Sequence, residues 1–389
     1  MRRRRERDVI EGSQFDASRQ LAHNRRLGGS SETLRPNVLA LWLSGGVPCI
    51  VYMFTASGFA YWLDSGELVA AAVQLDIAHP PGHPLSALWG KAFAFLPLGA
   101  LSFRVAIGQA LATALASVAC CRAILVALRG LRLDAWVSAP LAVLGAWVST
   151  FTYALWFQAV RPEVYALQTL CVAAICERLL RAGDEPSRAG QHFAMACAIL
   201  GLALANHHLI AFLLAPAFVP ALVAIVRRRR WRVLTLGCGA GALGLSTYLY
   251  LPLRAAHAPP ANLGDPSSWE RFYWVVSARV YAHDMGSEAV QPLGTRLLDV
   301  VVLWLDDLSG LALLLAALGL YAGLRLASTR RATAVLALVW WVDAFARAWL
   351  GPVRANPDIL GYLAPSYLAL GAFIALFAGV LCKALEKHV

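Results

Sequence analysis

The sequence predicts an all-α polytopic membrane protein with about ten transmembrane helices. Of its 389 residues, 59% are hydrophobic and only 15% are charged, and the mean hydropathy is +0.59. A soluble domain is typically about 45–50% apolar. The apolar residues are gathered in runs whose lengths are near the roughly 20 residues that a helix needs to cross a bilayer. The eight cysteines lie in or beside these runs without metal-ligand spacing, so we interpret them as small buried apolar side chains.

The chain begins with an arginine-rich polar segment, residues 1–37, which has no periodic apolar pattern. We predict a disordered basic cytoplasmic tail. The segment is too long and too polar for the first part of a cleaved signal, so the apolar run after it is expected to remain as the first span. Residues 38–382 then form one membrane-embedded domain, and residues 383–389 a second short cytoplasmic tail.

Ten apolar runs account for the predicted spans. Residues 85–98 are also apolar, but they are short and interrupted by Pro97, so we expect an interfacial or re-entrant piece there. The ten runs lie near 38–58, 103–128, 135–157, 164–181, 191–206, 208–226, 233–253, 303–325, 333–350 and 360–382.

Basic residues orient the predicted bundle. Most of the 34 Lys and Arg fall in the N-terminal tail and in every second connection after it, including the run from Arg227 to Arg230. This distribution follows the positive-inside rule and predicts that both termini are cytoplasmic. The net charge of +11 is explained in this way, and no nucleic-acid motif accompanies it, so no nucleic-acid partner is predicted.

The same topology places five polar clusters on the outer side of the membrane. Their convergence predicts a catalytic or binding cavity at the extracytoplasmic surface. The clusters are residues 64–83, residues 158–165, Asn206 with His207 and His208, the loop that holds Asn262, Asp265 and Trp269, and residues 354–358.

The first of these clusters holds Asp64, Glu67, His79 and His83. The two carboxylates are also what a helix N-terminus attracts, so capping is an alternative interpretation. We predict no metal site from the histidines, because cysteine, an HExxH-type helix and a clear third ligand are all missing from the pattern.

Three other features have structural alternatives to a functional role. Glu163 and Tyr165 also fit the start of a helix after Pro162, because proline is favoured in a first helical turn. His207 and His208 are interfacial residues if a span ends there. Asp343 and Arg347 are four residues apart within a predicted span, and we expect them to form an intrahelical ion pair, since an unpaired charge is costly in lipid.

Read together, the motifs resemble a bacterial and eukaryotic membrane family that includes a vertebrate transmembrane protein O-mannosyltransferase. The resemblance runs in register from about residue 40 to residue 380. It is carried by Asp64-Ser65-Gly66-Glu67, Ala78-His79-Pro80-Pro81-Gly82, Trp156-Phe157-Gln158-Ala159 with Glu163-Val164-Tyr165, Asn206-His207, Asn262 with Gly264-Asp265-Pro266, and Tyr362-Leu363-Ala364-Pro365-Ser366-Tyr367.

The resemblance implies a C-type glycosyltransferase bundle that uses a polyprenyl-phosphate sugar as donor, with mannose as the favoured sugar. It also implies a catalytic carboxylate in the first extracytoplasmic loop, at the position of Asp64, with Glu67 as its neighbour. This sequence departs from the family pattern at His83, where Tyr is expected, and at Leu263, where Trp is expected. Arg161 and Pro162 stand where small residues are more usual. We expect these departures to affect acceptor choice more than fold.

The residue types present suit such a transfer. Asp64 is the candidate general base, and Glu67 is expected to position an acceptor or a divalent cation. Candidates for contact with the donor phosphate are Arg161, Arg254 and the pair His79 and His83. Candidates for contact with the sugar are Trp62, Trp269, Gln158, Asn206 and Asn262. The remaining predicted substrate-binding residues are Glu163, Tyr165, His207 and Asp265.

The expected partners are the lipid bilayer, the lipid-linked sugar donor, and an acceptor that is a protein or a glycan. The alternative function is a transporter or flippase of a lipid-linked or small polar substrate. We see no repeat between the two halves of the chain, and the polar clusters lie at one rim instead of at mid-depth, so the transferase is favoured. A non-enzymatic assembly factor would leave the acidic motif of the first loop unexplained.

Overall fold

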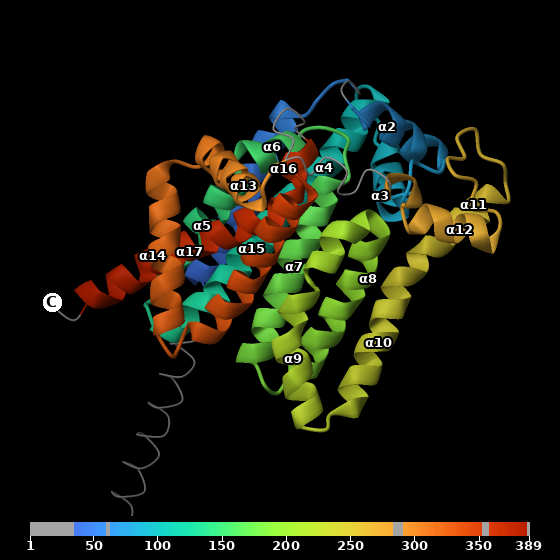
Figure 1. Cartoon of the computed structure of the whole chain (residues 1–389). Helices are drawn as coiled ribbons and strands as arrows, with labels where there is room; N and C mark the ends of the chain where they lie inside the picture. Colours follow the sequence, from blue (N-terminus) through green and yellow to red (C-terminus); the bar gives the residue numbers. More distant parts are fainter. Residues whose placement is uncertain (1–34, 60–62, 283–290, 352–357, 387–389) are drawn as a thin grey trace, which may run out of the picture.

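The computed structural model describes residues 35–59, 63–282, 291–351 and 358–386. Residues 1–34 of the predicted tail, Trp62, residues 354–357 and the last three residues lie outside this part. Within it the fold is all-α, as predicted, and the one β-type contact is an isolated bridge between Ile77 and Asn262. Figure 1 shows long helices that run side by side, with the short helices α2, α3, α6 and α16 gathered toward one end.

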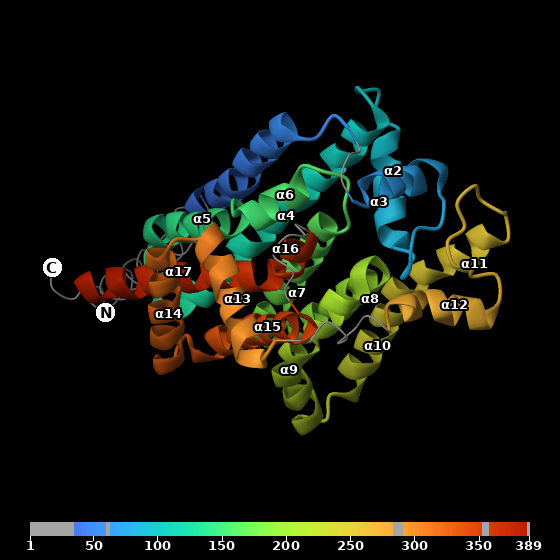
Figure 2. The ribbon, with the colours of Figure 1, turned by 45° about the horizontal axis from the view of Figure 1, so that its top comes forward.

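Six described helices are long and apolar enough to cross a membrane, and two bent helix pairs bring the number to eight. The bent pairs are α5 (Ala135–Thr150) with α6 (Tyr153–Ala159), at 76°, and α13 (Leu293–Asp307) with α14 (Gly310–Arg325), at 113°. The six single spans are Arg35–Thr55, Leu101–Leu131 (α4, Leu101–Leu128, with η1), Ala189–Leu213 (α8), Trp231–Ala255 (α10 to α11), Arg330–Leu350 (α15) and Ala364–Leu385 (α17). Figure 2 shows the first of these, in blue, beside α4.

Two of the ten predicted spans do not meet the length and composition of a span. Helix α7 (Tyr165–Asp184) has 20 residues, but Glu177, Arg178 and Arg181 make its second half polar. Helix α9 (Ala215–Arg227) has only 13 residues. The predicted span end at residue 206 is wrong, because α8 continues to Leu213 through a break at His207. Residues 85–98 do form a short piece, since α3 (Pro84–Ala94) has 11 residues.

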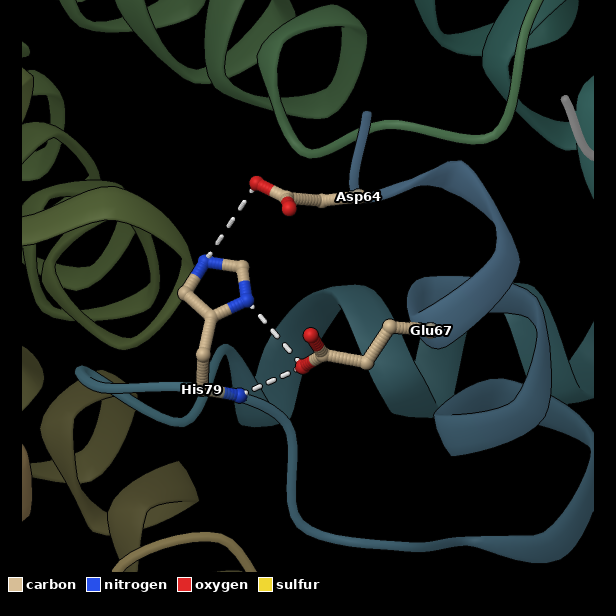
Figure 3. A group of neighbouring side chains, drawn as sticks. All are labelled: Asp64, Glu67 and His79. Carbon is tan, nitrogen blue, oxygen red and sulfur yellow. Dashed lines mark hydrogen bonds and ion pairs between the residues drawn. The ribbon is translucent and has the colours of Figure 1, made fainter. Parts of the chain in front are cut away.

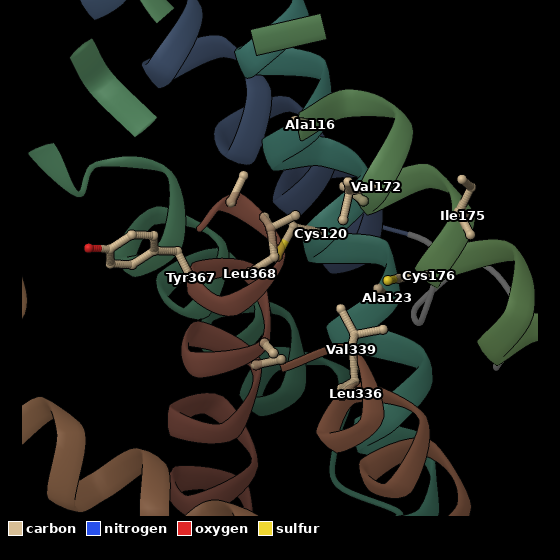
Figure 4. Close-up of a cluster of buried hydrophobic side chains, with 14 of the residues drawn as sticks. Ala116, Cys120, Ala123, Val172, Ile175, Cys176, Leu336, Val339, Tyr367 and Leu368 are labelled. Carbon is tan, nitrogen blue, oxygen red and sulfur yellow. The ribbon is translucent and has the colours of Figure 1, made fainter. Parts of the chain in front are cut away.

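The centre of the bundle is packed through small side chains. Ala116, Cys120 and Ala123 of α4 lie against Val172 and other residues of α7, with Leu336 and Val339 of α15 beside them (Figure 4). Helices α5 and α17 approach so closely that a Cβ added to Gly371 would lie 2.1 Å from Ser149 Oγ. Small residues allow this approach between membrane helices, where van der Waals packing drives association.

The cysteines only partly fit their predicted burial. Cys120, Cys121, Cys171 and Cys176 are buried, as predicted, and none of the eight forms a disulfide. Cys49, Cys197 and Cys382 are half-buried. The prediction is wrong for Cys238, which is exposed on α10. An apolar run predicts that a residue lies in a span, but it does not predict which face of that helix packs against its neighbours.

Candidate active site

A cavity of about 440 Å³ lies at the end of the bundle where the short helices gather. Segments far apart in the sequence form its walls: the start of α2 (Ser65–Gln74), the loop before α3, the start of α7, the break in α8, the end of α15 and α16 (Asp358–Tyr362). The polar residues lining it are Asp64, His79, His83, Glu163, Tyr165, His207, His208, Tyr281, Arg347, Asp358 and Tyr362. Four of the five predicted polar clusters therefore meet at one cavity.

In the first loop, Asp64 and Glu67 lie on opposite sides of the His79 ring (Figure 3). Glu67 Oε1 accepts hydrogen bonds from the His79 backbone N–H, at 2.6 Å, and from ring Nδ1, at 3.0 Å. His79 Nε2 lies 3.9 Å from Asp64 Oδ2. Asp64 stands at the cap position of α2 but makes no capping hydrogen bond with its side chain. The capping interpretation of Asp64 is therefore wrong, and its half-exposed carboxylate faces the cavity.

The charges in this loop follow from burial and from these hydrogen bonds. Burial alone would raise the pKa of Glu67, but the hydrogen bonds from His79 outweigh it, so the pKa of Glu67 is lowered. Burial would likewise lower the pKa of His79, and the bond to Glu67 with the charges of Glu67 and Asp64 raises it instead. Both shifts favour an ionised Glu67 and a protonated His79.

His83 is buried behind His79 and is held by the break in α8. In a regular helix the Asn206 carbonyl would accept from the backbone N–H of Ile210. Here His207 has φ −148° and ψ 93°, and the Asn206 carbonyl accepts from His83 Nδ1 at 2.6 Å. Burial keeps the pKa of His83 well below its usual value, so its ring is neutral and Nε2 is an acceptor. That atom lies 3.3 Å from His79 Nε2, which donates to it when His79 is protonated on both nitrogens.

Arg161 is a buried residue that ties three segments of the site together. Its guanidinium forms ion pairs with Asp358 of α16 and with Glu163, the latter at 3.6 Å. It also donates to Ser65 Oγ of α2 and to Gln158 Oε1 of α6. Arg161 and Gln158 do not line the cavity. Their position indicates that they hold the walls of the cavity together.

Glu163 lines the cavity and is almost fully buried. Burial raises its pKa from the ordinary 4.5 to about 7, even though Arg161 and the Val164 backbone N–H act in the opposite direction. One carboxylate oxygen each of Asp64, Glu163 and Asp358 lies within 4.8 Å of the other two. Hard divalent cations prefer such oxygen ligands, so these three residues are the candidates for holding one. Asp64, Glu67 and His79 form a second group of this kind. Members of both groups already have partners, since Glu163 and Asp358 pair with Arg161 and Glu67 bonds to His79.

The cavity also contains an arginine whose role the sequence did not predict. The expected ion pair between Asp343 and Arg347 is wrong: Asp343 accepts from the backbone N–H and the hydroxyl of Ser366 instead. Arg347 donates to the Gly351 carbonyl at 2.6 Å, and its guanidinium lies 5.4 Å from the centre of the Tyr362 ring. The side chains of Arg347 and Tyr362 both line the cavity. The sequence does contain one signal that points to Arg347 as a cavity residue, namely a charged residue near the end of an apolar span.

Besides Glu67, Gln158 and Arg161, five further predicted site residues lie outside the cavity lining: Asn206, Arg254, Asn262, Asp265 and Trp269. Asn206 is behind the wall, where its side chain donates to the Val164 carbonyl and to Gln168 Oε1. Arg254 donates to the Leu75 carbonyl at the end of α2. Asn262 donates to Asp265 in the loop that pairs with Ile77. Trp269 of α12 (Trp269–Val276) is 79% exposed and stacks on Phe272.

These positions have a common physical cause. Arg254 and the loop of Asn262 and Asp265 use their hydrogen bonds to attach α11 (Tyr250–Ala255) and the segment after it to the end of α2. The Arg254 guanidinium is therefore directed toward the protein backbone, and Asn262 is bonded to Asp265, so none of the three faces the cavity. The segment after α12 does reach the cavity, through Ala278 and Tyr281.

Comparison with known proteins confirms the predicted family resemblance. Residues 64–233 match the family model of the protein O-mannosyl-transferase TMEM260 N-terminal domain. The chain is 27% identical over 375 residues to protein O-mannosyl-transferase TMEM260 of Mus musculus, which covers 87% of this chain and 50% of that protein. It is 25% identical over 234 residues to the tmem260 protein of Dictyostelium discoideum, with coverage of 53% and 27%. The chain thus spans about half the length of the mouse relative. It matches about a quarter of the Dictyostelium relative.

A solved structure confirms the predicted fold. The crystal structure of ArnT from Cupriavidus metallidurans bound to undecaprenyl phosphate superposes with a TM-score of 0.56 at 15% sequence identity. The match covers 89% of this chain and 60% of ArnT. The bundle therefore has the fold of ArnT, and with its long apolar helices the chain is an integral membrane protein.

Proposed function

We propose that the chain is an inverting glycosyltransferase that moves a sugar from a polyprenyl-phosphate donor to an acceptor hydroxyl. The sugar is a hexose such as mannose, as the names of the curated relatives suggest. The polyprenyl donor is supported by the undecaprenyl phosphate bound to ArnT. The observation that carries the proposal is the position of Asp64, whose carboxylate stands at a cavity that also contains His79 and Arg347.

Asp64 is the general base in this proposal. An acceptor hydroxyl must lose its proton as it attacks the sugar, and a carboxylate within hydrogen-bond reach can take it. The Asp64 side chain is 53% exposed, and its one ion pair with a described residue is the 3.9 Å approach to His79, so an acceptor can reach it. A single base is sufficient for inversion, because the acceptor attacks opposite the leaving phosphate.

Arg347 and His79 are the positively charged groups that stabilise the donor phosphate in this proposal. The leaving group is a lipid phosphate, and cationic donors of hydrogen bonds stabilise the charge that develops on it. Arg347 lies in the last turn of α15, where this span ends at the cavity. A phosphate bound there leaves its isoprenoid tail in the bilayer. The rings of Tyr165 and Tyr362, 5.4 Å apart, provide aromatic surface for the sugar.

The cavity opens on the extracytoplasmic side in this proposal, and both termini are cytoplasmic. The support is the distribution of arginine, which is concentrated at the connections away from the cavity. The acceptor is a protein or a glycan hydroxyl. A divalent cation held by Asp64, Glu163 and Asp358 would supply positive charge that stabilises the departing phosphate.

The test uses the full chain in proteoliposomes with radiolabelled polyprenyl-phosphate mannose and a mixture of acceptor peptides. We expect release of polyprenyl phosphate and a labelled product that mass spectrometry identifies. Asp64→Asn should reduce transfer at least about a hundredfold. Asp134→Asn is the matched control, since Asp134 caps α5 through the Trp136 N–H and asparagine caps equally well. Full activity of Asp64→Asn, or movement of intact donor across the bilayer without transfer, would contradict the proposal.

A further inference from the structure

A second cavity, of about 560 Å³, lies between helix Arg35–Thr55, α4, α5 and α7. Four arginines line it: Arg122 from α4, Arg129 from η1 (Arg129–Leu131), Arg132 from the connection to α5, and Arg181 from α7. Four leucines from the same region line it too, and no carboxylate is among its described lining residues. The cavity is therefore both strongly basic and partly apolar.

Helix α7 connects this cavity to the candidate active site. It begins at Tyr165, which lines the active-site cavity, and it ends at Asp184, which pairs with Arg129. A helix of 20 residues is about 30 Å long, so the arginine cavity lies about that far from the candidate active site, at the other end of α7. It lies where two candidate membrane spans have their ends, since Arg35–Thr55 begins there and Leu101–Leu131 ends there.

Ion pairs hold most of these arginines in place. Glu177, which is 2% exposed, pairs with Arg122 at 3.0 Å and also with Arg181 and Arg178. Arg129 pairs with Asp184 and with Glu185. Glu177 and Glu185 each pair with more than one arginine, and Asp184 pairs with Arg129.

Arg132 differs from the other three arginines. Its guanidinium is exposed and has no ion pair or hydrogen bond with any residue that the structure describes. The nearest acid in sequence, Asp134, caps α5. The cavity thus has fixed guanidinium groups and one additional positive charge directed to no protein partner.

We propose that this cavity binds the phosphate headgroup of an anionic membrane lipid. Guanidinium groups match phosphate oxygens in geometry and charge. The leucines provide an apolar surface for the start of the acyl chains, which a free inorganic anion would not need. Basic pockets between membrane helices on the cytoplasmic side suit anionic headgroups, and the proposed topology puts the cavity on that side. This site is separate from the proposed transferase function and does not depend on it.

The experiment measures lipid retention by native mass spectrometry of the delipidated full chain, titrated with phosphatidylglycerol or with zwitterionic phosphatidylcholine. We expect one phosphatidylglycerol to bind with preference over phosphatidylcholine. Arg132→Gln should weaken that binding about fivefold, the effect of one charge near a membrane surface. Arg132 holds no other described side chain, so this variant is expected to fold normally.

Arg227→Gln is the matched control, because Arg227 is exposed in another arginine-rich connection and does not line the cavity. Its phosphatidylglycerol binding should equal that of the wild type. Equal binding by wild type and Arg132→Gln, or equal binding of the two lipids, would overturn the proposal. Displacement of the bound lipid by millimolar inorganic phosphate would instead show a free-anion site and would overturn the lipid assignment.

Discussion

A single carboxylate oxygen of Glu67 accepts two hydrogen bonds from His79, one from its backbone N–H and one from its imidazole ring. These bonds fix the ring so that Nε2 faces Asp64 and the cavity. We infer that Glu67 acts on the site through His79, as a positioning residue for that ring. The sequence suggested instead that Glu67 positions an acceptor or a divalent cation.

Glu67→Gln should lower kcat about tenfold and change the pH dependence of transfer. The glutamine keeps an acceptor for His79 but removes the negative charge that raises the pKa of His79. Removing an opposite charge beside a protonated base lowers the pKa of that base. The alkaline limb of the pH–rate profile should therefore move to lower pH. Glu270→Gln, at an exposed position on α12, is the control, and an unchanged profile in Glu67→Gln would exclude the positioning role.

The buried carboxyl of Glu163 should make stability fall as pH rises. Its folded-state pKa is about 7 against an ordinary 4.5, so between these values the unfolded chain releases a proton that the folded chain keeps. The stabilising contribution is complete below pH 4.5 and is lost as pH passes 7. The full effect is about 3 kcal/mol.

Thermal unfolding in detergent tests this prediction. Glu163→Gln resembles the protonated carboxyl, so its Tm should exceed that of the wild type at pH 8, and the difference should shrink at pH 5. A wild-type Tm that depends on pH no more than that of Glu163→Gln would show that Glu163 is ionised in the folded protein throughout.

Composition and charge were sufficient to predict the helical fold and the polar clusters that meet at the cavity. Asp64, Glu163, His207 and Asp358 all follow or interrupt apolar segments on the side with few arginines, so their convergence follows from topology alone. The pattern does not indicate in which direction a given side chain points around its helix axis. It therefore predicted neither the exposure of Cys238 nor the turn of Arg347 toward the cavity.

The break in α8 is a second feature without a local signal. No glycine or proline stands at residues 205–209, and the break depends on a hydrogen bond between His83 and Asn206, which are 123 residues apart. Asp343 similarly uses Ser366 as its partner, 23 residues away, in place of the neighbour at four residues. Tertiary partners of this kind decide between local alternatives that the sequence leaves equal.

Gly371→Ala should destabilise the fold. The new Cβ would lie 2.1 Å from Ser149 Oγ and 2.3 Å from the Gly145 carbonyl, so α5 and α17 would have to separate. Overpacking of this kind typically costs about 1–3 kcal/mol, and Tm in detergent should fall by several degrees. Gly46→Ala is the control, because nothing lies within 4 Å of its added Cβ. An unchanged Tm in Gly371→Ala would mean that this contact is looser than the structure shows.

Arg347→Gln should raise KM for the polyprenyl-phosphate donor about tenfold to a hundredfold, because a hydrogen bond to a charged group contributes about 1.5–3 kcal/mol. Arg347→Lys keeps the charge but loses the planar fork, so its KM should lie between those of the wild type and Arg347→Gln. Inhibition by free polyprenyl phosphate should weaken in parallel, whereas KM for the acceptor should not change. Arg330→Gln, at the exposed start of the same helix, controls for loss of charge on α15. If donor KM were unchanged while kcat fell, Arg347 would act only on the transition state, and if neither changed, the phosphate would bind elsewhere in the cavity.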